Sequence, residues 1–106
     1  MRPRQFEVFA NPIPRARRSM PYVVPLQHDF ADLGENRIVA PLTHRRRAPE
    51  GPRQVLPAVT VAGDDYVVLV PLLAAIRTNG LGAPVSHLGE HRDDFTAALD
   101  FLFTGF

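Results

Sequence analysis

Proline is the feature that most restricts what this chain can fold into. It accounts for 11 of the 106 residues, about double its usual share, and an interior proline interrupts the hydrogen bonding of a helix. Short apolar runs bounded by Pro, Gly and Asp recur along most of the sequence, which is typical of strands joined by turns. We therefore expect a mainly β protein, with strands at 5–10, 21–27, 36–42, 55–61, 66–70 and 83–88.

The segments between these strands predict a hairpin and two loops. Ala62–Asp65 is a turn-forming cluster between two runs rich in β-branched residues, which predicts an antiparallel hairpin. Residues 11–20 and 43–52 each combine Pro with three Arg. We expect both to be solvated loops and the second to be mobile, because its arginines repel one another and its Pro and Gly oppose regular pairing.

A single helix is expected over residues 91–103. Apolar residues recur there at intervals of three and four, which predicts one stripe facing a core. The stripe consists of Phe95, Ala98, Leu99, Leu102 and Phe103. Asp93 and Asp94 fall in the first turn, where carboxylates complement the helix dipole. Gly105 is suited to end the helix in a left-handed conformation. Phe106 then either packs against the sheet or a partner subunit, or is presented to another protein.

Length, charge and cysteine content set the broad class of protein. We expect residues 1–106 to form one domain, without Cys for a disulfide framework or a thiolate metal site. No apolar stretch approaches the roughly 20 residues that span a bilayer, and no signal-peptide pattern is present, so a soluble, cytoplasmic protein without a membrane partner is expected. The net charge of +1 combines ten Arg and five acids in residues 1–57 with two Arg and six acids in residues 58–106.

The titratable residues form no recognisable catalytic or metal-binding motif. His87 and His91 straddle a glycine and lack the spacing of metal ligands, and Ser86 would point to the opposite face of a strand from His87. The acidic pairs at 64–65 and 93–94 are explained by a turn and by a helix start. We expect no catalytic residue, no metal and no cofactor, and a protein that acts by binding.

The two arginine-rich loops have two interpretations at this point. Arg15–Arg18 and Arg45–Arg47 have the composition of phosphate-binding segments, but no aromatic residues are interleaved with them for base stacking. A solvated charged loop explains the same composition. Both interpretations stay open.

Read in order, five segments resemble the CcdB family of bacterial toxins, and together they span almost the whole chain. Val24–Asp32 (VPLQHDFAD) is similar to the family pattern V-D-V-Q-S-D-[IL]-[IL]-D, and Arg37–Leu42 (RIVAPL) to R-[LM]-V-I-P-L. Gln5-Phe6 matches the opening of the first strand, and Pro57 matches an L-x-P strand. Ala97–Phe106 resembles the C-terminal helix and tail, with Thr-Gly-Phe where the best-known form ends Trp-Gly-Ile.

This resemblance implies an SH3-like barrel of the CcdB/MazF type, with an antiparallel sheet and one C-terminal helix, assembled as a homodimer. It also implies a toxin that performs no chemistry. Such a toxin binds the DNA gyrase A subunit, traps the gyrase–DNA cleavage complex and is neutralised by a CcdA-like antitoxin. Sequence-specific nucleic-acid binding by the toxin alone is not expected. Two alternatives remain: a MazF-like endoribonuclease on the same fold, and a non-toxic CcdB remnant.

The resemblance further implies which residues bind these partners. The gyrase-facing residues would be Phe6, Phe30, Ala31, Asp100, Thr104, Gly105 and Phe106. Phe6 and Phe30 have an alternative role in the core, and Asp100 has one as a solvated helix residue. The antitoxin of such a toxin has a C-terminal segment that is disordered until it binds. If that segment is acidic, it would bind the positively charged Arg45, Arg46 and Arg47.

Overall fold

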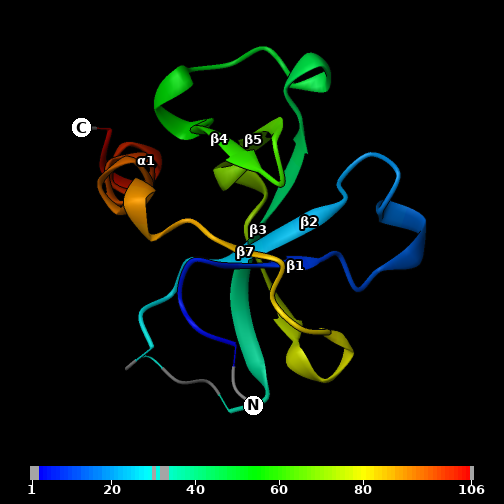
Figure 1. Cartoon of the computed structure of the whole chain (residues 1–106). Coiled ribbons are helices and arrows are strands. Elements are labelled where there is room, and N and C mark those ends of the chain that lie inside the picture. Colours follow the sequence, from blue (N-terminus) through cyan, green and yellow to red (C-terminus); the bar gives the residue numbers. More distant parts are fainter. Residues whose placement is uncertain (1–2, 30, 32–33, 106) are drawn as a thin grey trace.

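The computed structural model describes residues 3–29, 31 and 34–105, whose backbone forms an antiparallel sheet with a helix packed beside it (Figure 1). Within these residues the sheet has seven strands, in the order β4-β5-β3-β2-β1-β7, with β6 paired to β3. The strands are β1 (Glu7–Ala10), β2 (Tyr22–Pro25), β3 (Asn36–His44), β4 (Ala58–Val61), β5 (Asp64–Val68), β6 (Ala74–Arg77) and β7 (Ser86–His87). The helix is α1 (Arg92–Thr104).

The long strand β3 gives the sheet its barrel shape. Its residues 36–39 pair with β6, 39–42 with β2 and 42–44 with β5. A strand that changes partners along its length bends the sheet around a core, and the result is a nearly closed barrel with one C-terminal helix. The expected mainly β fold is therefore confirmed. β3 runs two residues further than predicted, because Thr43 and His44 pair with β5.

The predicted hairpin is present, with a tighter turn than expected. β4 and β5 are joined by Ala62 (φ 51°) and Gly63 (φ 85°) alone. Two successive positive φ values are typical of a type I′ turn, whose twist matches that of the strands. The two strands predicted at 55–61 and 66–70 do not reach residues 55 and 70, their ends away from the turn. Arg53–Val55 and Val70–Leu72 form 3-10 turns, termed η3 and η4, each beside a proline that cannot donate to a sheet.

The remaining strands show where prediction was less accurate. The strands expected at 5–10, 21–27 and 83–88 are shorter than predicted, and β6 was not predicted at all. β6 has the sequence AAIR, which is too short and too small in its side chains to stand out. It forms because Ala74–Arg77 lies opposite Val39–Asn36 in the sheet.

Alternating residues of the strands bury apolar side chains on both faces of the sheet. Val8 and Val24 belong to the main core, between the sheet and α1, while Phe9 and Val23 belong to a second cluster on the opposite face. Phe95 and Ala98 of α1 are 1% and 0% exposed and complete the main core. This two-sided burial is what the period-two geometry of a strand produces when both faces are covered.

The helix lies within one residue of its predicted start and end. Gly105 has φ 80° and its N–H donates to the Phe101 carbonyl at 3.0 Å, so the predicted left-handed helix end is confirmed. The prediction for Phe103 was wrong, because its side chain is 70% exposed. Residues 101–103 are all apolar and project in different directions, so one core cannot cover all three. Among the described residues, no helix combines the length and apolar composition needed to cross a membrane.

Candidate partner-binding surfaces

His87 and His91 have local structural roles near the start of α1. Within this part of the chain no three His, Cys, Asp or Glu side chains gather as metal ligands would. His87 Nδ1 accepts a hydrogen bond from the Gly89 N–H at 2.9 Å, and His91 Nδ1 lies 3.2 Å from Asp94 Oδ2. A Cβ on Gly89 would lie 2.5 Å from His87 Cε1, so the close approach requires glycine there.

Phe6 lies in the core of the monomer. Its side chain is 3% exposed, its ring centroid is 5.4 Å from that of Phe95, and the Arg92 guanidinium lies 4.9 Å from its ring centroid. Its φ of 69° is a conformation that side chains with a Cβ rarely adopt. Phe6 is therefore a core residue, which was the alternative to its role as a gyrase contact. The Arg92 guanidinium lies over its ring.

The loop after β2 is attached to the start of the chain. The Gln5 N–H donates to Asp29 Oδ1 at 2.8 Å, and the Ala31 N–H donates to the His28 carbonyl at 2.9 Å. Ala31 is exposed on the turn that results. Phe30, which the resemblance also placed at the gyrase surface, lies outside the described residues, as does Phe106.

The C-terminal end of α1 brings three of the predicted residues together. Asp100 is exposed, and its carbonyl accepts a hydrogen bond from Thr104 Oγ1 at 2.6 Å. Gly105 follows and closes the helix on Phe101, as described above. These three residues form an exposed end of the helix, which we term the helix-end surface.

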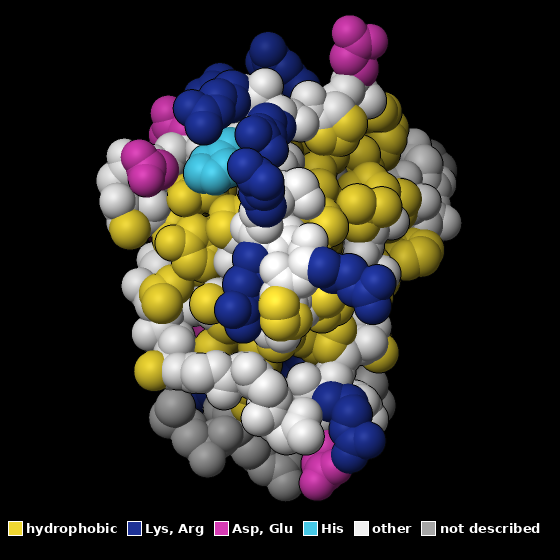
Figure 2. Space-filling model, turned by 90° about the vertical axis from the view of Figure 1, so that its right-hand side faces the viewer, with side chains coloured by type: hydrophobic (Ala, Val, Ile, Leu, Met, Phe, Trp, Pro, Cys, Tyr) yellow, Lys and Arg dark blue, Asp and Glu magenta, His cyan; other side chains and the backbone are white. Residues whose placement is uncertain are grey.

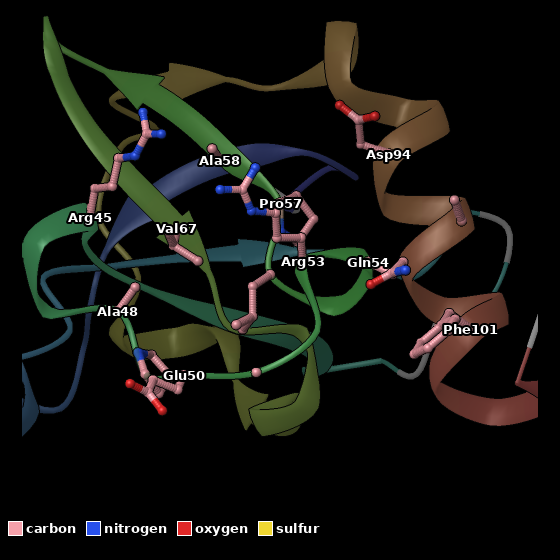
Figure 3. A pocket seen from close by; sticks show the side chains of 14 residues that line it. Arg45, Ala48, Glu50, Arg53, Gln54, Pro57, Ala58, Val67, Asp94 and Phe101 are labelled. Atoms are coloured by element: carbon pink, nitrogen blue, oxygen red, sulfur yellow. The ribbon is translucent and has the colours of Figure 1, made fainter.

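A groove separates α1 from the segment that follows β3. It has a volume of about 840 Å³. Val67, Leu56 and Pro57 supply apolar lining from the barrel side and Phe101 from the helix, and Arg45 and Asp94 lie at opposite margins (Figure 3). Its other lining residues are Ala48, Pro49, Glu50, Gly51, Arg53, Gln54, Ala58 and Ala97.

Sequence reasoning missed this groove, although it noted the arginines beside it. The lining residues come from β5, the 45–58 segment and α1, which are far apart in the sequence, and no local pattern marks such a junction. Only the unusual density of Pro and Gly in residues 49–57 hints at a segment that follows a surface instead of joining the sheet.

Arg45, Arg46 and Arg47 are exposed and form a single 3-10 turn, η2, directly after β3. Arg45 lines the groove, so the start of η2 borders the apolar lining. Arg45 and Arg46 also line a shallower hollow with Asp64 and Asp65, the acidic pair of the hairpin. The segment predicted to be a loop therefore contains a defined turn of three exposed arginines, of which Arg45 lines the groove.

Burial of Tyr66 below this hollow has an electrostatic consequence. Tyr66 is 4% exposed, and its ring lies 4.9 Å from that of His44 and 5.4 Å from that of Tyr22, measured between centroids. Burial raises the pKa of the Tyr66 hydroxyl above its ordinary value of 10.0, and Tyr22 and Asp64 raise it further. Tyr66 is thus kept neutral beneath the acidic turn.

Comparison with known proteins identifies the family of this chain. The family model described as CcdB protein matches residues 5–105 of the chain. None of the curated proteins that were searched matches it. A match over nearly the whole length shows the family: the chain belongs to the CcdB family, a family of toxin–antitoxin toxins.

Proposed function

We propose that this protein binds the DNA gyrase A subunit, traps the gyrase–DNA cleavage complex, and is neutralised by a CcdA-like antitoxin. The observation that carries the proposal is the family match over residues 5–105, which includes the helix-end surface. In this proposal the protein acts by occupying its partner and catalyses nothing. Because gyrase works on chromosomal DNA, the proposal also places the protein in the cytoplasm.

The helix-end surface is the proposed gyrase site. Asp100 and Thr104 are exposed, and Gly105 fixes the direction in which the chain leaves the helix. Phe106 follows directly in the sequence and is proposed as an aromatic anchor, because aromatic side chains contribute much apolar area at small entropic cost. Ala31 is a proposed secondary contact. Phe6 supports the site from within by packing under Arg92 and against α1.

The groove and η2 together are the proposed antitoxin site. A disordered segment gains affinity by burying apolar residues and specificity from complementary charge. The groove offers apolar lining, Arg45 offers positive charge at its margin, and Arg46 and Arg47 follow Arg45 in the same turn. The matching partner is a segment with apolar residues followed or preceded by Asp and Glu.

The gyrase proposal is tested with purified protein, gyrase from the same host and supercoiled plasmid. We expect the wild type to increase protein-linked, cleaved plasmid, and a truncation lacking residues 104–106 to abolish this while its thermal unfolding stays cooperative. Asp100→Asn, which keeps the shape of the side chain, should reduce the amount of cleaved plasmid. The distal control variant, Arg4→Gln with Arg77→Gln, removes two exposed charges elsewhere and should behave as wild type.

Retained cleavage by the truncated protein would show that residues 104–106 are not the anchor. Absence of cleaved plasmid with the wild type would remove the gyrase proposal itself. In that case, incubation of the same wild-type preparation with RNA distinguishes the remaining alternatives: RNA cleavage supports a MazF-like endoribonuclease, and intact RNA supports a non-toxic remnant.

The antitoxin site is tested by replacing all three arginines of η2 with glutamine. We expect a loss of affinity for the antitoxin segment and a weaker dependence of the remaining affinity on salt, since exposed charges act over about 10 Å at 0.1 M ionic strength. The distal control variant should bind normally. Unchanged affinity and unchanged salt dependence would remove Arg45–Arg47 from the site.

A further inference from the structure

The two arginine-rich loops, which are separate in the sequence, leave the sheet at the same end. β2 and β3 are antiparallel neighbours with Tyr22 opposite Leu42, so residues 11–20, before β2, and η2, after β3, emerge side by side. The Thr43 hydroxyl donates to the Ser19 carbonyl at 2.8 Å and ties the 11–20 loop to the end of β3, two residues before η2. Figure 2 shows the face that includes the 11–20 loop, with most of its Arg side chains over the upper half and middle and another near the lower edge beside an acidic side chain.

The 11–20 loop has a fixed structure, organised by one buried amide. Asn11 is 3% exposed, its Nδ2 donates to the Met20 carbonyl at 2.8 Å, and its Oδ1 accepts from the Ile13 N–H at 3.0 Å. Arg17 Nε donates to the Asn11 carbonyl at 2.6 Å. Because both ends of the loop are held on Asn11, the exposed Arg15 and Arg18 are presented from a defined scaffold.

The charge of this face is positive and little compensated. No Asp or Glu occurs between Glu7 and Asp29 or between Glu35 and Glu50, the two stretches that contain both loops and both strands. Among the described residues, no ion pair involves the arginines of either loop. Asp64 and Asp65 lie near Arg45 and Arg46 and partly compensate their charge. The arginines of the 11–20 loop therefore have the least compensated charge on this face.

We propose that this face, made of Arg15, Arg17 and Arg18 with Arg46 and Arg47, binds the phosphate backbone of duplex DNA without reading its sequence. Guanidinium groups match phosphate oxygens in pairs, and a duplex presents closely spaced phosphates to a charged surface that spans two loops. The loops carry no aromatic residue on which unpaired bases would stack, which favours duplex over single strands.

A DNA backbone fits this face better than an acidic peptide does. The apolar groove suited to a peptide lies beside α1 and is lined by Arg45 and Arg53, but by no residue of the 11–20 loop. The loop instead projects from the sheet (Figure 1). The proposal goes beyond gyrase poisoning and does not depend on it, although a DNA contact would add to binding wherever gyrase holds its substrate.

The experiment measures binding of the full chain to a labelled duplex of about 20 base pairs of arbitrary sequence, by fluorescence anisotropy at several salt concentrations and without gyrase. We expect the affinity to fall steeply with salt. The variant Arg15→Gln with Arg18→Gln should bind at least about tenfold more weakly and lower the salt slope by about one for each arginine that contacts a phosphate. The distal control variant has the same net charge as the Arg15→Gln, Arg18→Gln variant. It should bind the duplex as tightly as the wild type does.

Three outcomes would overturn the proposal. The first is no binding by the wild type at low salt, and the second is an equal loss in the distal control variant, which would indicate a response to net charge alone. The third is a loss of antitoxin affinity in the Arg15→Gln, Arg18→Gln variant while DNA binding is unchanged, which assigns the face to a protein partner. Since gyrase is absent from the assay, these outcomes leave the cleavage test of the proposed function unaffected.

Discussion

At the scale of single residues, Tyr66 shows how the barrel controls an ionisable group. Its side chain is buried on β5, the strand that begins with Asp64, and burial is the largest of the causes that raise the pKa of its hydroxyl. The unfolded chain exposes the same hydroxyl to water, where its ordinary pKa of about 10 applies. The folded protein therefore retains this proton at pH values where the unfolded chain releases it.

This difference predicts a loss of stability in alkali. Below pH about 10 both states hold the proton, so the contribution of Tyr66 is fully present there. As the pH rises from 10 towards the folded pKa, only the unfolded chain is deprotonated, and the free energy of unfolding falls. Urea unfolding across this range should show the fall in the wild type and a flatter curve in Tyr66→Phe.

A matched variant separates this effect from general alkaline damage. Tyr22→Phe removes the neighbouring phenol but leaves Tyr66 buried, so it should keep the part of the slope that burial, the largest single cause of the shift, produces. The interpretation is wrong if Tyr66→Phe and wild type lose stability in parallel.

At the scale of elements, the sequence predicted the strands, turns and helix ends that depend on residues close together in the chain. The β4–β5 hairpin and the Gly105 helix end depend on neighbouring residues, and both were predicted. β6 and the last two residues of β3 were not, because their partners lie more than twenty residues away in the sequence.

The candidate surfaces divide in the same way. The exposed arginines and the helix end were visible as composition and periodicity, whereas the groove and the adjacency of the two basic loops depend on how strands pair. Phe6 illustrates the limit most directly: its place at the start of a strand does not reveal that it is buried against Phe95.

The 11–20 loop gives an element-scale prediction. Asn11→Ala removes the amide that joins the Met20 carbonyl and the Ile13 N–H. Leaving such buried groups without a partner costs about 1–3 kcal/mol, so the urea midpoint should fall by a corresponding amount. Trypsin should also cleave faster after Arg15, Arg17 or Arg18, because the loop loses its anchor.

Ser19→Ala is the control for this loop. The Ser19 hydroxyl makes only an exposed contact of 3.4 Å with the Ala16 carbonyl, while its backbone carbonyl still accepts from Thr43. This variant should match the wild type in stability and in cleavage rate. Equal behaviour of Asn11→Ala and Ser19→Ala would show that the strands, and not Asn11, hold the loop.

At the scale of the whole molecule, the opposite charges of the two halves of the sequence are only partly separated, because Asp64, Asp65 and Asp94 lie near Arg45. The basic loops lie at one end of β2 and β3, whereas Asp93, Asp94 and Asp100 belong to α1. Apolar side chains are exposed on the helix side as well. Phe103 of α1 is 70% exposed, and Leu72 of η4, which packs against α1, is 56% exposed.

We propose that these two side chains are covered by a second copy of the chain. Homodimers bury more apolar interfaces than transient complexes do, and a large aromatic residue that is exposed in the monomer is a good candidate for the centre of such an interface. The variant Leu72→Asp with Phe103→Asp places two charges there. Light scattering after size-exclusion chromatography should report a dimer for wild type and a monomer for the variant.

Val85→Asp is the matched control for the dimer, because Val85 is 53% exposed but lies before β7, away from both residues in the chain. It should remain dimeric at concentrations where the double variant is monomeric. Losing a central aromatic contact costs about 2 kcal/mol or more, so the dimer should weaken by at least about tenfold. A wild type that is monomeric at every concentration would exclude the dimer, and a double variant that stays dimeric would place the interface on another face.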